Sequence, residues 1–204
     1  MHISDGVMPT SLAIGSGVVS LALTAWSAHR TRNRDLPKVA VVAAAFFVAA
    51  LIHVPLGPTS VHLVLPGVVG ALLGPSAFIA IAIGLVLQSL LFQFGGLTAL
   101  GCNALLMGLP ALGCGLLFQL LKGTTIRRQM LVGGLSGGLG IIGSALLLAL
   151  LLAASGEDFL VVAKFALAAH LPVAIIETLV AAFIVRFLAR VKPEMLTAPF
   201  TLKD

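Results

Sequence analysis

The first six residues of the chain, Met1-His2-Ile3-Ser4-Asp5-Gly6, carry groups that can hold a metal ion. The free amine of Met1, the backbone nitrogen of His2 and Nδ1 of the His2 imidazole can bind one ion together in two fused chelate rings. These three nitrogens lie nearly in one plane and leave one position of a square-planar ion for another donor. Nitrogen-rich tetragonal geometry favours Ni(II) or Cu(II) and also accommodates Co(II). The alternative is that His2 is an ordinary residue of a frayed terminus.

The chelate needs Met1 to be retained, which the bulky neighbour His2 favours, and it needs a fourth donor. His62 is our candidate, since it follows directly on the turn at residues 56–60. A His at the head of an apolar span must find a partner or a cavity. A structural His62 bonded to the backbone is therefore the alternative to a ligand. Residues expected beside the metal rather than on it are Asp5, His53, Ser60 and Asn103.

The composition indicates an all-α polytopic membrane protein. Of the 204 residues, 59% are hydrophobic and 9% are charged, and the mean hydropathy is +1.15, which excludes an ordinary soluble domain. The chain contains no repeat of solenoid period and no linker, so we expect one domain over residues 1–204. Cys102 and Cys114 are expected to be two buried thiols rather than a disulfide.

Charge patterning predicts the topology. Seven apolar segments are expected to cross the membrane: 9–28, 39–55, 61–73, 76–94, 97–121, 129–154 and 159–190. With the N-terminus outside and the C-terminus in the cytoplasm, every Lys and Arg except Lys164 falls on the inner side, as the positive-inside rule requires. The net charge of +5 is thereby explained without a nucleic-acid partner. Segment 61–73 is short, but a re-entrant segment there would place the basic residues of loop 122–128 outside.

Several polar residues lie within the apolar segments. Gln88, Gln93 and Asn103 are expected to bond to irregular backbone or to one another, because unpaired amides are costly in hydrocarbon. His170 and Glu177 lie seven residues apart and share a helix face. For this pair we expect an interhelical hydrogen-bond network, with a second metal or proton site as the alternative. The absence of P-loop, H-E-x-x-H and G-x-S-x-G motifs argues against an enzyme.

Three stretches together resemble a known family. They are Met1-His2 with Gly6, the run 53–62 (HVPLGPTSVH) and the run 91–103 (LFQFGGLTALGCN). The chain resembles the substrate-binding (S) components of energy-coupling-factor transporters for cobalt and nickel, the CbiM/NikM family. In that family the terminal amine, the amide and imidazole of residue two and a distal His hold the metal, which implies these roles for Met1, His2 and His62. The stretch Ile3-Ser4-Asp5 departs from many relatives, which leaves the role of Asp5 open.

The resemblance implies a mode of action and a set of partners. The chain would bind Co(II), or Ni(II), as its cargo in the bacterial inner (plasma) membrane and supply cobalt for cobalamin biosynthesis. Its partners would be a transmembrane scaffold (T) component, two cytoplasmic ATPases and a small accessory membrane subunit. The alternative is a stand-alone divalent-metal channel or secondary carrier. A channel needs a polar path and weak binding at several sites, whereas this chain has a tight chelate at one end.

Overall fold

The structure is a computed structural model that describes residues 2–51, 53–56 and 59–198, with the backbone alone described for 53–56 and 59–62. These ranges contain seven α-helices and one β-hairpin. The helices are α1 (Thr10–Arg30), α2 (Leu36–Ala50), α3 (Pro66–Leu73), α4 (Ala77–Phe92), α5 (Leu100–Leu121), α6 (Ile126–Ser155) and α7 (Leu160–Val191). The hairpin pairs β1 (His53–Leu56) with β2 (Thr59–His62) in antiparallel orientation.

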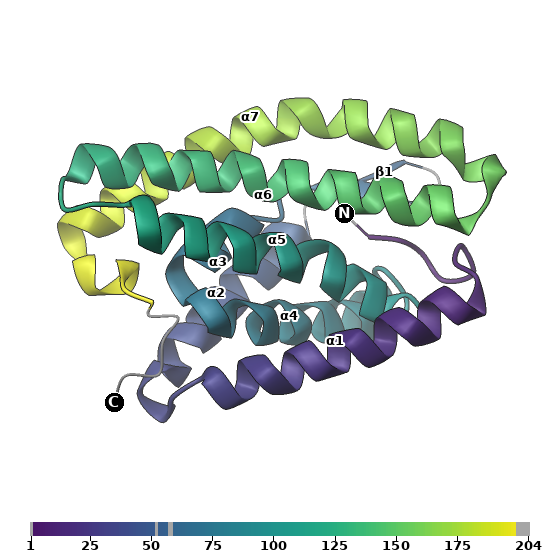
Figure 1. Cartoon of the computed structure of the whole chain (residues 1–204), viewed down its shortest axis with the longest axis horizontal. Coiled ribbons are helices and arrows are strands. Elements are labelled where there is room, and N and C mark those ends of the chain that lie inside the picture. Colours follow the sequence, from purple (N-terminus) through teal and green to yellow (C-terminus); the bar gives the residue numbers. More distant parts are fainter. Residues whose placement is uncertain (1, 52, 57–58, 199–204) are drawn as a thin grey trace.

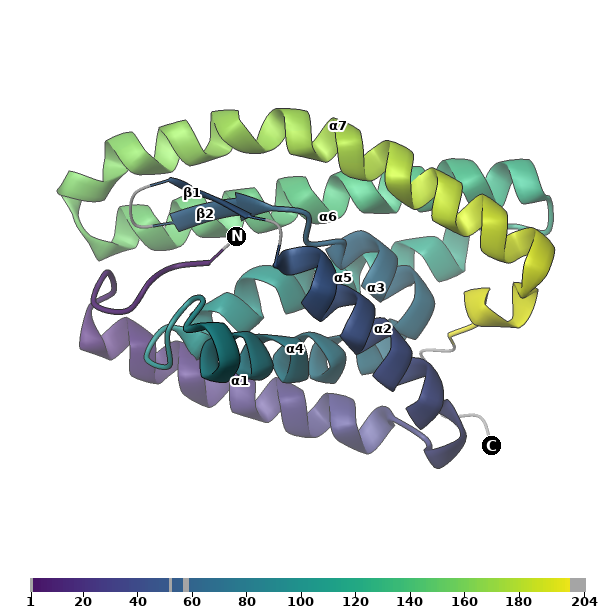
Figure 2. The same cartoon turned by 180° about the vertical axis from the view of Figure 1, so that it is seen from behind.

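The helices form a bundle in which α6 and α7 run side by side on one flank and α1 lies on the opposite flank (Figures 1 and 2). Helices α2 to α5 fill the space between them. Small residues allow the close approach of α6 and α7, because a Cβ added at Gly137 would lie 2.7 Å from the carbonyl oxygen of Glu177. The Gly-rich run of α6 therefore serves helix packing.

Helix length and composition support five membrane crossings, two fewer than the charge pattern predicts. The candidates are α1, the segment Pro66–Phe92, α5, α6 and the segment Glu157–Val191. Helix α2 has only 15 residues, and α3 has 8 and continues through a 3-10 turn at Gly74–Ser76 into α4. At about 1.5 Å per residue, neither α2 nor α3 alone reaches across ~30 Å of hydrocarbon.

The region around residue 60 differs most from the expectation. The sequence predicts an apolar segment at 61–73 preceded by an external turn, whereas residues 53–56 and 59–62 pair as strands and α3 begins only at Pro66. Every residue of α3 is buried. An apolar run that is fully enclosed by protein need not be long enough to span a membrane, because neighbouring helices rather than lipid surround it.

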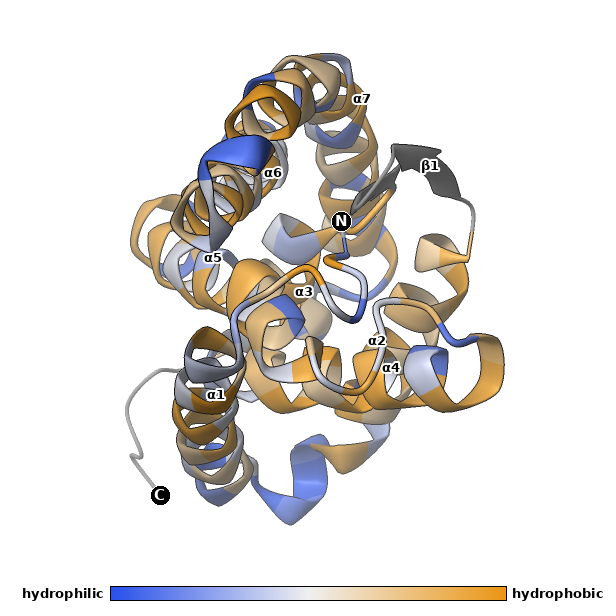
Figure 3. Cartoon of the chain, turned by 90° about the vertical axis from the view of Figure 1, so that its right-hand side faces the viewer, coloured by the Kyte–Doolittle hydropathy of each residue, from blue (hydrophilic) through white to orange (hydrophobic). Residues whose placement is uncertain are grey.

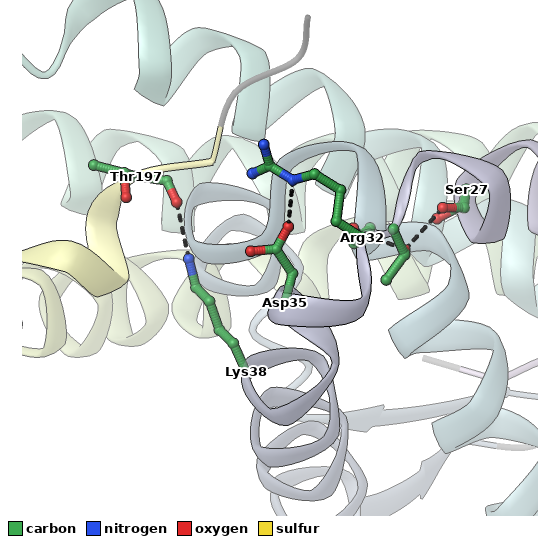
Figure 4. Close-up of polar contacts among 7 residues, drawn as sticks. Ser27, Arg32, Asp35, Lys38 and Thr197 are labelled. Carbon is green, nitrogen blue, oxygen red and sulfur yellow. Dashed lines mark hydrogen bonds and ion pairs between the residues drawn. The ribbon is translucent and has the colours of Figure 1, made fainter. Parts of the chain in front are cut away.

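The two ends of the bundle differ in charge. The α1–α2 and α5–α6 junctions and the end of α7 lie together at one end, which we call the basic end (left in Figure 1). There Arg32 pairs with Asp35 at 2.8 Å, and the ammonium of Lys38 donates to the carbonyl of Thr197 at 3.0 Å (Figure 4). Lys122 donates to the carbonyl of Leu196. The structure thus gathers the basic loops at one end, as the predicted topology requires.

The N-terminal segment lies at the opposite end, in the middle of the end-on view between the α6–α7 pair and helices α2 and α4 (Figure 3). The helices around it are coloured mainly as hydrophobic. The thiols of Cys102 and Cys114 are free and buried, as expected of two buried thiols rather than a disulfide.

Candidate metal-binding site

The N-terminal segment is docked into the bundle through Asn103 of α5. The side chain of His2 is 5% exposed and that of Ile3 is fully buried. The Ile3 amide donates to Oδ1 of Asn103 at 2.8 Å, and Nδ2 of Asn103 donates to the Ile3 carbonyl at 3.0 Å. Because one side-chain amide satisfies both backbone groups of Ile3, it fixes the peptide plane that follows His2. Asn103, expected beside the site, therefore positions the terminus.

Gln88 of α4 orients the His2 imidazole. Its Oε1 lies 2.9 Å from Nε2 of His2, and its Nε2 donates to the carbonyl of Phe47 at 3.4 Å. The bond to Phe47 turns the amide so that its oxygen faces His2, and Nε2 of His2 must then carry the proton. Nδ1 keeps its lone pair, which is the tautomer that a chelate through Nδ1 requires.

Asp5 ties the segment to the start of α5. Its carboxylate accepts hydrogen bonds from the amides of Leu97, Thr98 and Ala99 and from the Thr98 hydroxyl. These amides precede the first turn of α5, where a negative charge also complements the helix dipole. The hydrogen bond from the Thr98 side chain is the largest cause that lowers the pKa of the exposed Asp5 carboxyl. Burial opposes it, and the hydrogen bonds from the backbone amides of Leu97, Thr98 and Ala99 lower the pKa further. Asp5 is thus an anchor of the terminus, which answers the question that the sequence leaves open.

The Gly95-Gly96 turn leaves room for the N-terminal segment. Both residues have positive φ, 78° and 68°, a conformation that favours glycine. A Cβ added at Gly95 would lie 2.9 Å from Cδ2 of His2 and 2.8 Å from Nδ2 of Asn103, and one at Gly96 would overlap the Asp5 carboxylate. The Gly95-Gly96 turn therefore leaves the space that the N-terminal segment occupies.

The hairpin brings the two predicted histidines of the 53–62 region level with each other. Its register pairs His53 with His62 and Pro55 with Ser60. Met1 lies outside the described residues, as do the side chains of His53, Ser60 and His62. The assignment of Met1 and His62 as ligands, and of His53 and Ser60 as neighbours, stays a prediction.

Among the described residues, no group of three or more His, Cys, Asp or Glu side chains could hold a metal ion. A site at His2 therefore has to draw on other donors. The terminal amine, the backbone nitrogen of His2 and a side chain of the hairpin are the donors that the sequence offers.

Known proteins resemble this chain in sequence and in fold. The model of one protein family, "Cobalt uptake substrate-specific transmembrane region", matches residues 2–195. The chain belongs to this family, CbiM.

Relatives of this CbiM chain carry names that refer to metal transport. A Haemophilus influenzae protein named for metal transport is 36% identical over 199 residues, which cover 96% of this chain and 97% of the relative. The fused nickel transport protein NikMN of Rhodobacter capsulatus is 34% identical over 162 residues, which cover 73% of this chain and 46% of that longer protein. A crystal structure described as a transition metal transporter has the same fold, with a TM-score of 0.80, 24% identity and coverage of 94% and 93% of the two chains.

Two buried ionisable residues of this CbiM chain, His170 and Glu177, have different hydrogen-bond partners. The Glu177 carboxylate accepts hydrogen bonds from the amides of Val64 and Leu65, ahead of α3. Nδ1 of His170 donates to the carbonyl of Ala166 in its own helix at 2.6 Å. The expected network between helices is thus replaced, for Glu177, by bonds to the segment ahead of α3, and the Nδ1 bond of His170 stays within α7.

Sequence reasoning missed the position of Gln88 beside His2. The signal was present, because an amide in an apolar span needs a partner, but no spacing relates residue 88 to residue 2. Gln93, the other amide of this stretch, ends α4 in the left-handed conformation and lines a pocket together with Ser4 and Asp5.

Proposed function

We propose that this chain binds Co(II) or Ni(II) as cargo through Met1, His2 and His62 and is the substrate-specific subunit of a metal importer. The observation that carries the proposal is the held imidazole of His2. A frayed terminus would leave it in solvent, whereas here it is buried and oriented by Gln88. A metal-binding imidazole usually donates its other ring N–H to an acceptor that fixes its tautomer and its orientation.

The proposed donor set has a chemical logic. An amine, an amide nitrogen and an imidazole from adjacent residues chelate in a plane, and a second imidazole completes a square. The Asn103 clamp and the Asp5 anchor hold the backbone of this segment. Such preorganisation reduces the entropy that binding has to overcome.

The topology of the proposal has the N-terminus outside and the C-terminus in the cytoplasm, with the chain acting as one transmembrane domain. The gathering of basic side chains at the end remote from His2 supports it. The metal is then taken up from outside. As the resemblance to the family implies, import against a gradient would use a scaffold protein and two ATPases, with a small accessory membrane subunit. The cobalt would supply cobalamin biosynthesis.

Uptake of radioactive cobalt and nickel by cells tests this proposal. We expect uptake when the chain is co-expressed with its scaffold and ATPase partners, and none with an ATPase-inactive partner. His2→Ala in this chain should abolish uptake, and Arg127→Gln at the basic end should serve as the matched control. Uptake by this chain alone would instead identify a stand-alone channel or carrier.

A further inference from the structure

Glu177 is a buried carboxylate whose partners lie next to the hairpin. It is fully buried in the middle of α7. Its Oε1 accepts from the amides of Val64 at 2.6 Å and Leu65 at 2.9 Å, and its Oε2 accepts from Leu65 at 3.1 Å. A buried carboxylate needs such partners. These three hydrogen bonds join α7 to a segment more than one hundred residues earlier in the chain.

The segment that Glu177 holds has an unusual backbone. Leu65 has a φ of 54°, in the left-handed region, and Pro66 begins α3 directly after it. A leucine in this conformation is strained unless its surroundings hold it. Glu177 supplies that support through the hydrogen bonds that it accepts from the Val64 and Leu65 amides.

Both sides of this contact are immobilised by the bundle. A Cβ added at Gly67 of α3 would overlap the carbonyl of Ser136 in α6, and the Glu177 backbone is itself packed against Gly137 of α6. The exit of the hairpin is therefore fixed relative to α6 and α7. His62 is the last residue of β2 and stands only two positions before Val64.

We propose that Glu177 is a positioning residue for the metal site: by holding the Val64 and Leu65 amides it fixes the end of β2 and so sets His62 at the fourth metal position. This inference rests on the proposed function. It assigns Glu177 no contact with the metal. Gln88 in α4 and Asn103 in α5 hold the N-terminal half of the site. Glu177 in α7 holds the half that the hairpin contributes.

The test is a double-mutant cycle on the purified full-length protein with Ni(II) as the probe. Affinity is measured by titration, and the number of imidazole ligands by metal-edge X-ray absorption. Glu177→Gln keeps the side-chain shape but puts an NH2 donor in place of one carboxylate oxygen, so that the contact of Oε2 with the Leu65 amide becomes donor against donor. We expect it to lower affinity by at least about tenfold and to reduce the imidazole count from two to one, as His62→Ala does. The exposed Glu157→Gln serves as the matched control.

The double variant Glu177→Gln with His62→Ala decides whether Glu177 acts through His62. We expect it to bind no more weakly than His62→Ala alone, because coupled residues are not additive. Two imidazoles in Glu177→Gln, or losses that multiply in the double variant, would overturn the inference. A wild-type protein that binds Ni(II) without N-terminal nitrogen donors would instead overturn the proposed function.

Hydrogen exchange on the wild-type protein covers the case in which Glu177→Gln does not fold. We expect the amides of Val64 and Leu65 to be protected before metal is added, since Glu177 holds them in the metal-free state. If these two amides exchanged like an open loop until Ni(II) was added, Glu177 would not position the hairpin.

Discussion

Oε1 of Gln88 lies 2.9 Å from Nε2 of His2, although 86 positions separate the two residues in the chain. The contact joins the N-terminal segment to α4. It also determines that Nδ1 of His2 is the nitrogen that keeps its lone pair. A residue at a terminus is usually mobile. Here the terminal imidazole is held as firmly as a core side chain, and the first prediction follows from this contact.

Replacing Gln88 with Leu should weaken metal binding without unfolding the protein. The apolar side chain fills a similar volume but removes the acceptor that orients His2. Loss of the hydrogen-bond partner that orients a metal-binding imidazole costs about 10- to 100-fold in metal affinity. Titration with Ni(II) and Co(II) measures the effect, with Gln129→Leu, at a half-buried position of the basic end, as the matched control. Equal affinities for the two variants would show that Gln88 does not orient the ligand.

Gly95→Ala should damage the site through space and backbone strain. The new methyl group would press on His2 and Asn103, and Ala is disfavoured at a φ of 78°. We expect a loss of about 1 kcal/mol in stability together with weaker metal binding. Gly113→Ala is the control, because nothing lies within 4 Å of its added Cβ and Ala favours a helix. Thermal unfolding with and without metal separates the effect on stability from the effect on metal binding. A Gly95→Ala variant that binds metal normally would show that the site does not depend on the space beside Gly95.

His62→Ala should remove the fourth donor and reduce metal retention and uptake severely, whereas His53→Ala should cost much less. The hairpin pairs the two residues directly, so a general disturbance of this region would affect both variants alike. Retained metal is measured by mass spectrometry of the purified protein. Equal losses, or a greater loss for His53→Ala, would place the wrong histidine at the metal.

The pH dependence of metal affinity should come from the protonation of the nitrogen donors and not from that of Asp5. Nitrogen ligands must lose their protons to bind, so affinity should fall by more than about tenfold per pH unit below neutrality, given ordinary pKa values of about 6.5 for imidazole and about 7.8 for the amine. The pKa of Asp5 is lowered by its hydrogen bonds. Asp5 therefore stays ionised from pH 8 to 5, and its contribution to docking is lost only below its ordinary value of about 3.9.

Titrations across this range check the assignment. We expect Asp5→Asn to keep the slope of affinity against pH that the wild type has. An affinity that did not change from pH 8 to 5 would rule out the amine–amide–imidazole site and favour a carboxylate site.

The long helices were predictable because each is a continuous apolar run. The segments predicted at 97–121, 129–154 and 159–190 correspond to α5, α6 and α7 with ends shifted by a few residues. The hairpin was not predictable, because a short apolar stretch suits a strand and a helix equally well.

Adjacency in the chain is enough to propose a chelate at His2, and its ligands stay a prediction. Asn103 was expected beside the site, but the other contacts that hold the N-terminal segment and the hairpin were not. The contacts of Gln88 with His2 and of Glu177 with Val64 and Leu65 are long-range. They depend on how α4 and α7 pack, which no local pattern in one sequence contains.

The most direct test of the central claim is the metal affinity of the protein with one Gly added before Met1, compared with the natural terminus. The addition turns the Met1 amine into an amide and removes one donor, while a tag at the C-terminus leaves the site unchanged. We predict that Ni(II) and Co(II) binding collapses in the extended protein although it remains folded, and that the C-terminally tagged protein binds normally. Full affinity in the extended protein would contradict the N-terminal chelate.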